Sequence, residues 1–104
     1  MKNFLSIDFI SKFSNEEIYQ IFSTELPNYK WHRGESDLQG PYVSGFNNDD
    51  VHIQCWTGEN PIAMSVSFRS SSLNEKSRDE TISKIDEIII SSLSGSNIEI
   101  RYSP

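Results

Sequence analysis

Residues able to support catalysis or to hold a metal ion are few in this chain, and their spacing suits neither role. The chain has two histidines, His32 and His52, and one cysteine, Cys55. They do not form the closely spaced His and Cys clusters that zinc sites use. If residues 51–56 form a strand, His52 and Cys55 point to opposite faces of a sheet, which disfavours a Cys–His nucleophilic pair. We therefore expect no metal, no cofactor and no enzymatic activity, with Cys55 an ordinary core thiol.

Carboxylates offer a second route to chemistry. Glu35 and Asp37 are close enough in sequence to act as an acid–base pair. Two other interpretations compete with this one: Asp37 hydrogen-bonds loop amides, or the carboxylates contact a partner. The surrounding loop, Gly34–Gly40, contains glycines but no lysine, and it precedes an expected strand rather than a helix. It therefore does not match a phosphate-binding loop.

Negative charge is concentrated in the middle of the chain. The formal net charge is −6, and no lysine or arginine occurs from Gly34 to Phe68. The acidic residues in that stretch are Glu35, Asp37, Asp49, Asp50 and Glu59. Because nucleic-acid binding depends on Lys and Arg, we expect no nucleic-acid partner. The acidic stretch indicates either a solvated surface that aids solubility or an electrostatic field that attracts a basic partner. Asp49 and Asp50 also suit a hairpin turn.

The centre of the chain predicts three consecutive antiparallel strands, at residues 42–46, 51–56 and 62–69. Apolar and polar residues alternate along the last two, which is the pattern of a strand buried on one side only. Turn-forming residues separate the three strands at 47–50 and 57–61. Gly45, inside the first of them, predicts a bulge or a close neighbour.

Two helices flank these strands. Ser14 and Glu17 stand at capping-box spacing and predict the start of a helix that Pro27 ends. A second box at Ser77–Glu80 predicts a helix that ends at Gly95, a residue suited to the left-handed conformation. Alternation also allows strands near residues 29–33 and 97–102, while residues 5–10 fit either a short strand or a helix.

The fold class that follows is α+β, with residues 1–104 forming a single domain. We expect two layers: a mostly antiparallel sheet of about five strands with two helices on one face, in the order (β)αββββαβ. The opposite face would be uncovered and would carry His52, Gln54, Trp56, Ser65, Ser67, Arg69, Glu99 and Arg101. Trp56, among polar neighbours, either fills a small hydrophobic cluster or anchors a binding partner.

The sequence around these strands is similar to that of a known group of proteins. Residues 29–45, 51–56 and 65–69 together resemble small acidic bacterial immunity proteins of contact-dependent and polymorphic toxin systems. The resemblance consists of aromatic, glycine and acidic positions over about residues 29–69, and it assigns no role to any single residue. It implies a cytoplasmic protein that binds and neutralises a cognate toxin domain, such as a basic nuclease.

We accordingly expect a partner-binding surface rather than a catalytic site. Its residues would be Glu35, Asp37, Tyr42, Asp49, Asp50, His52, Gln54, Trp56 and Glu59. The alternative is a small-ligand-binding or enzymatic site around His52, Trp56 and Arg69, and self-association through the uncovered face is a third interpretation. No apolar run is long enough to span a membrane, and a lone cysteine without a secretory signal favours the cytoplasm.

Overall fold

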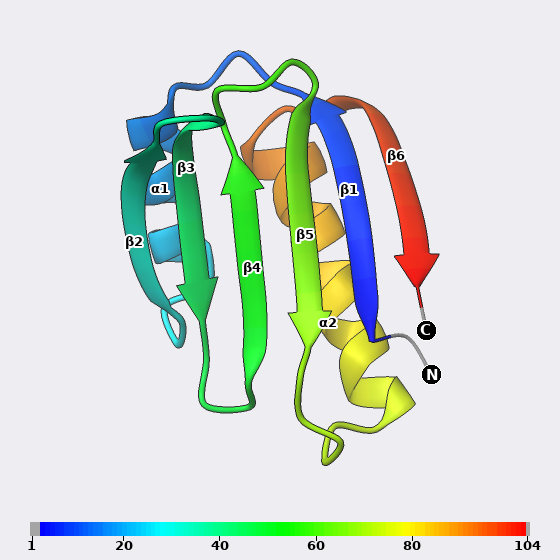
Figure 1. The fold of residues 1–104 in the computed structure, drawn as a ribbon. Coiled ribbons are helices and arrows are strands. Elements are labelled where there is room, and N and C mark those ends of the chain that lie inside the picture. Colours follow the sequence, from blue (N-terminus) through cyan, green and yellow to red (C-terminus); the bar gives the residue numbers. More distant parts are fainter. Residues whose placement is uncertain (1–2, 104) are drawn as a thin grey trace.

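The computed structural model describes residues 3–103, and its strands and helices form two layers. The elements are β1 (Phe4–Ile10), α1 (Asn15–Glu25), β2 (Lys30–Ser36), β3 (Gly40–Phe46), β4 (Val51–Trp56), β5 (Ile62–Phe68), α2 (Glu75–Glu87), the π-helical segment η1 (Ile88–Ser92) and β6 (Ser96–Ser103). Figure 1 shows the sheet as one layer and both helices as the other, behind it. The α+β class expected from the sequence is confirmed.

The sheet has six strands rather than about five, because the N-terminal segment forms a strand in its interior. The strand order is β2-β3-β4-β5-β1-β6, and all neighbours are antiparallel. Leu5, Ile7 and Phe9 of β1 are completely buried. The local pattern alone left helix and strand open here. Pairing with β5 on one side and β6 on the other selects the strand, since it satisfies the backbone hydrogen-bonding groups of a buried segment.

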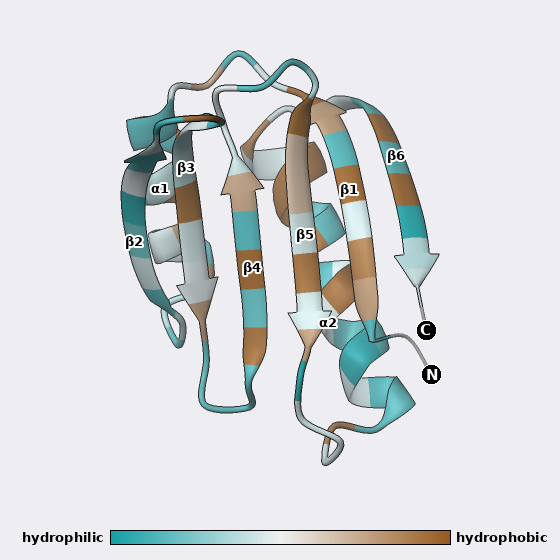
Figure 2. Ribbon diagram, viewed as in Figure 1, coloured by the Kyte–Doolittle hydropathy of each residue, from teal (hydrophilic) through white to brown (hydrophobic). Residues whose placement is uncertain are grey.

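Alternation along the strands places the core between the sheet and the helices. Along β4 and β5 every second residue is buried, and Figure 2 shows the alternation on β4 as brown and teal bands. Ile18 and Phe22 of α1 and Ile82 and Ile85 of α2 bury their side chains in the same core. The helices therefore cover one face of the sheet, and the core lies between that face and the helices.

Helix α1 begins with the capping box that the sequence predicts. Ser14 Oγ accepts a hydrogen bond from the Glu17 amide at 3.2 Å, and Glu17 Oε1 accepts one from the Ser14 amide at 2.9 Å. The bond from the Ser14 backbone, together with the nearby Ser14 hydroxyl, favours the carboxylate and lowers the pKa of Glu17. This start of α1 therefore matches the sequence prediction.

Trp31 joins the end of α1 to the sheet. Its indole Nε1 donates to the Leu26 carbonyl at 2.9 Å, and its ring stacks on Phe22 with 5.0 Å between centroids. The same ring lies across Gly45 of β3, where a Cβ would stand 2.5 Å from it. The close neighbour that Gly45 predicts is thus Trp31, and any side chain at this position would displace the indole.

Helix α2 begins at Glu75, three residues earlier than the expected capping box implies. The N-cap is Asn74, whose side-chain oxygen accepts from the Ser77 amide at 2.8 Å. The buried side chain of Arg78 explains the early start. Its Nε donates to the Leu73 carbonyl at 3.0 Å, which ties the loop before the helix to the helix's first turn. The prediction of a second box at Ser77 was therefore wrong.

The prediction for Gly95 also needs correction. The left-handed residues after the helix are Ser94 and Asn97, with φ of 51° and 53°, and not Gly95. Gly95 is required for a different reason: its amide donates to the Ile89 carbonyl at 2.8 Å, and a Cβ there would lie 2.6 Å from Ile89 Cγ2. Close approach, rather than backbone conformation, excludes a larger residue at this position.

Candidate functional site

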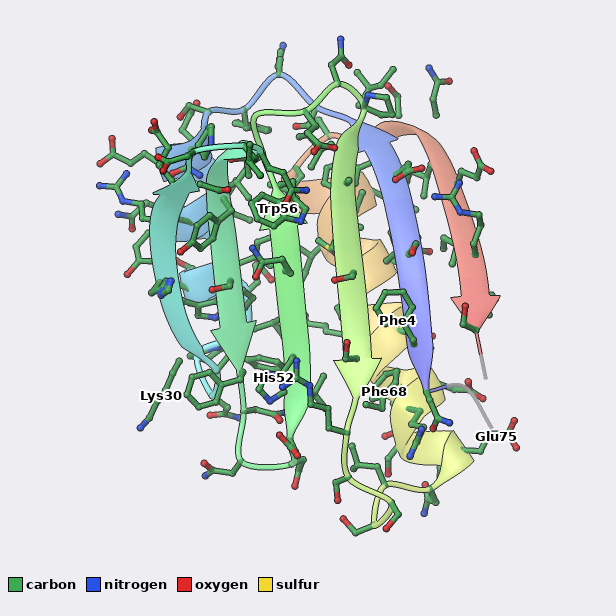
Figure 3. All side chains as sticks on the ribbon, viewed as in Figure 1. Phe4, Lys30, His52, Trp56, Phe68 and Glu75 are labelled. Atoms are coloured by element: carbon green, nitrogen blue, oxygen red, sulfur yellow. The ribbon has the colours of Figure 1, made fainter. Side chains whose placement is uncertain are left out.

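The face of the sheet opposite the helices is the candidate site, because no part of residues 3–103 covers it (Figure 1). Strand pairing arranges its side chains in three rows that cross the sheet. The His52 row consists of Lys30, Phe46, His52, Ser67, Phe4 and Ser103; the polar row of His32, Ser44, Gln54, Ser65, Ser6 and Arg101; and the Trp56 row of Gly34, Tyr42, Trp56, Ala63, Asp8 and Glu99. In Figure 3 the His52 and Trp56 rows lie toward opposite ends of the sheet.

The Trp56 row is built around an aromatic contact between neighbouring strands. The rings of Tyr42 and Trp56 meet edge to face, with 5.3 Å between centroids. Tyr42 also lies 5.5 Å from the ring of His32, with 3.4 Å between Tyr42 Oη and His32 Nε2. Its ring covers Gly34, where a Cβ would stand 2.6 Å from the hydroxyl. The two half-buried rings thus support each other and still present a surface to solvent.

The His52 row combines aromatic surface with charge. Phe46 stacks on the His52 ring at 5.6 Å between centroids and remains 46% exposed. His52 Nε2 lies 2.7 Å from Asp50 Oδ1, and the Asp50 carbonyl accepts from the Arg69 amide at 3.1 Å. Asp50 has a φ of 60°, so the turn holds a residue other than glycine in the left-handed region. Phe4, 37% exposed, continues the row on β1.

Between these two rows, serines and Gln54 of the polar row occupy the centre of the open face. A hollow of about 170 Å³ lies over β3, β4 and β5, and Ser44, Gln54, Ser65 and Ser67 are among the residues that line it. Small-molecule sites are commonly clefts of roughly 300–1,000 Å³. The open face is therefore better shaped for a flat macromolecular partner than for an enclosed ligand.

The acidic residues singled out by the sequence are divided between the two ends of the sheet. Asp37 and Glu59 lie in the turns after β2 and β4, whereas Asp49 and Asp50 lie in the turn after β3. Because consecutive antiparallel strands turn at alternate ends, these two groups are separated by the length of the strands. Glu35 lies within β2, opposite Pro41, and its side chain is on the face toward the helices. Of these five acids, Asp50 contacts an open-face residue, His52.

His52, Trp56 and Arg69, grouped by the alternative interpretation, do not form one site. Arg69 follows the end of β5 and lines the hollow beside His52. Trp56 is four residues from His52 along β4, about 13 Å away at the rise of a β-strand. The structure therefore brings Arg69 to His52 but leaves Trp56 at the other end of the face.

Sequence reasoning missed a second cavity on the helix side. A cleft of about 620 Å³ lies between the α1–β2 connection, the β3–β4 turn and α2, lined in part by Tyr29, Asp49, Glu80 and Lys84. Burial, and secondarily the charge of Asp49, raises the pKa of Tyr29 to about 12. The three segments are far apart in the chain, so no local pattern indicates that they meet. The exposed Phe46, by contrast, follows from extending the alternation of β3 past Tyr42.

The remaining chemical expectations concern Cys55, metals and membranes. Cys55 is completely buried on the face opposite His52, and burial raises the pKa of its thiol to about 12. Its expected role as a core thiol is confirmed. Within residues 3–103, no group of three His, Cys, Asp or Glu side chains is arranged to hold a metal ion. None of the helices in that range has the length and apolar character needed to cross a membrane.

Comparison with known proteins adds no assignment. The chain matches no protein-family model, and no curated protein shows significant similarity to it. The resemblance to immunity proteins therefore remains a prediction from the sequence.

Proposed function

We propose that this protein is an immunity protein whose open sheet face binds a cognate toxin domain and thereby blocks the toxin. The observation that carries the proposal is the open face itself, with partly exposed aromatic rings in two rows and small polar side chains between them. Interfaces gain most of their binding energy from a few aromatic and arginine side chains surrounded by weaker contacts. Tyr42, Trp56 and Phe46 supply such aromatic side chains on this face, at its two ends.

The size and flatness of the face support a protein as the partner. The molecule is at least 26 Å across in each principal direction. A face of that width covers roughly 700 Å², which is comparable with the ~800 Å² that each partner contributes to a standard interface. The hollow of about 170 Å³ on this face is small for a metabolite. The open face therefore offers contact area rather than enclosure.

The charge of the chain favours a basic toxin, a nuclease being one example. A net charge of −6 attracts a positively charged domain over a distance of about one Debye length. Asp50 stands at the edge of the His52 row and would lie next to a bound partner. There it would take the place of a nucleic-acid phosphate and pair with the basic residues of the toxin.

The alternative, a small-ligand or enzymatic site around His52, Trp56 and Arg69, has less support. One observation favours a site at His52 alone: its Nε2 lies 2.7 Å from Asp50 Oδ1, and catalytic histidines are also held by a neighbouring carboxylate, there through Nδ1. However, the hollow beside that pair measures about 170 Å³, and Trp56 lies about 13 Å away along β4. We therefore rank protein binding first.

The neighbouring gene provides the test. If that gene ends in a small basic domain, expression of the domain alone should arrest growth, and co-expression of this chain should restore growth and yield a stable complex. Replacing both Tyr42 and Trp56 by alanine should abolish protection. The matched control is Ile90→Ala, which removes a side chain that is 54% exposed in the helix layer. Protection that survives the double substitution would contradict the assignment of the open face.

A further inference from the structure

The two edge strands of the sheet differ in how they are protected against further pairing. Edge β6 carries a register shift against β1 between Asp8 and Ile10, and its Asn97 has a left-handed backbone. Bulges and other irregularities of the backbone are among the devices that keep an edge strand from pairing with other chains.

Edge β2 has a regular backbone instead. All its residues from Lys30 to Ser36 pair with β3 in an unbroken register, from Phe46 back to Gly40. Its other side has no strand beside it in the part of the chain that the structure describes. The outer backbone groups of β2 are therefore available to a further strand.

Two oppositely charged residues of β2 are incompletely paired. Arg33 lies over the Tyr19 ring at 5.7 Å and reaches Glu16 only at 3.9 Å, with 46% of its side chain exposed. Glu35 is exposed and has no ion-pair partner among residues 3–103. Both side chains point to the helix side of the sheet, on either side of Gly34. A strand added to this edge could pair both charges at once.

We propose that β2 pairs antiparallel with β2 of a second copy of this chain, with Gly34 on the two-fold axis. Residues directly opposite each other in such a pair lie on the same face. Centring the pair on Gly34 therefore places Arg33 opposite Glu35 twice and His32 opposite Ser36 twice. Centring it on Arg33 would oppose two arginines, and centring it on His32 would place Arg33 opposite Trp31. Of these three registers, the one centred on Gly34 joins opposite charges.

The surroundings of Gly34 fit this arrangement. Gly34 carries no side chain, and the Tyr42 ring covers it on the open face. A two-fold axis at Gly34 brings the Tyr42 rings of both copies next to each other. The result is one continuous sheet of twelve strands whose open faces lie side by side.

The pairing involves one short strand from each copy, so the dimer is weak. Interfaces at the low end of the size range bind in the micromolar range or more weakly. Analytical ultracentrifugation from about 10 µM to about 1 mM covers that range. We expect a reversible equilibrium between monomer and dimer, with symmetric dimers only.

Charge reversal tests the register. Arg33→Glu and Glu35→Arg each create two like-charge pairs across the axis and should raise the dissociation constant by at least about tenfold. The double variant R33E/E35R restores opposite charges in both positions and should return to the wild-type value. Lys76→Glu, at an exposed position on α2, changes the net charge as Arg33→Glu does and should have little effect.

Several outcomes would overturn the proposal. A chain that stays monomeric up to about 1 mM does not pair through β2. A dimer that is insensitive to both single substitutions, or that the double substitution fails to restore, uses another surface or register. Circular dichroism of each variant distinguishes loss of pairing from loss of folding. Binding to the toxin can be measured separately, so this proposal and the proposed function can fail independently.

Discussion

The two faces of the sheet are made of the same strands, yet they carry different kinds of side chain. On the face toward the helices, Leu5, Ile7 and Val66 have no exposed surface at all. On the other face, serines occupy the centre and partly exposed aromatic rings occupy both ends. The two faces therefore have different roles. The covered face stabilises the fold, and the open face carries aromatic surface that the core does not use.

The largest expected contrast is in stability. Phe22→Ala removes a completely buried ring from the covered side and should lower the free energy of unfolding by about 3–5 kcal/mol. Ser65→Ala, in the polar row of the open face, should change it by less than about 0.5 kcal/mol. Urea denaturation of both variants measures the difference. Equal losses would mean that the open face is part of the core after all.

The second contrast is in binding. Trp56→Ala should weaken the complex with the toxin domain by about 2 kcal/mol or more, roughly 30-fold, because a few aromatic side chains supply most of the binding energy of an interface. The same change should affect unfolding far less than Phe22→Ala, since the Trp56 ring is only half-buried. Calorimetric titration and urea denaturation of one preparation give both values. A large loss of stability with unchanged binding would reverse the roles assigned to the two faces.

The ends of the open face can be compared by their charges. Replacing Asp49 and Asp50 by lysine should slow association with a basic toxin roughly tenfold and flatten its dependence on salt. The matched control replaces Asp37 and Glu59, at the opposite end of the sheet, by lysine. Stopped-flow rates at several salt concentrations distinguish the two. Identical slowing by both variants would show that total charge matters and the end of the sheet does not.

The last prediction concerns pH. Because the pKa of Tyr29 is raised from 10.0 to about 12, its neutral form is favoured in the folded state. Its contribution to stability is complete below about pH 10 and is lost as the pH rises toward about 12, where the folded state also ionises. Tyr29→Phe should therefore reduce the loss of stability in that window. Thermal unfolding between these pH values tests the expectation, and an unchanged pH dependence would contradict it.

The central strands could be predicted from the sequence because apolar and polar residues alternate strongly along them. β4 and β5 alternate over their full length, and one buried face then fixes the orientation of His52 and Trp56. The capping box at Ser14 could also be predicted, because its two partners, Ser14 and Glu17, are only three residues apart in the sequence.

Features that depend on distant contacts were not readable. The position of β1 depends on pairing with β5 and β6. The start of α2 depends on the hydrogen bond from the buried Arg78 side chain to the Leu73 carbonyl. The separation of Asp37 from Asp49 depends on which end of the sheet each turn occupies. Local periodicity carries none of this information, because each feature results from tertiary packing.

The interior position of β1 has a consequence for synthesis of the protein. Phe4 pairs with Ser67 on one side and with Ser103 on the other, so β1 needs partners that are translated after it. Until β6 has left the ribosome, Leu5, Ile7 and Phe9 cannot reach their final surroundings. Folding that depends on such non-local pairing is slow compared with helix formation. The nascent chain thus exposes the apolar side chains of β1 until β6 is translated and is, during that time, a substrate for chaperones.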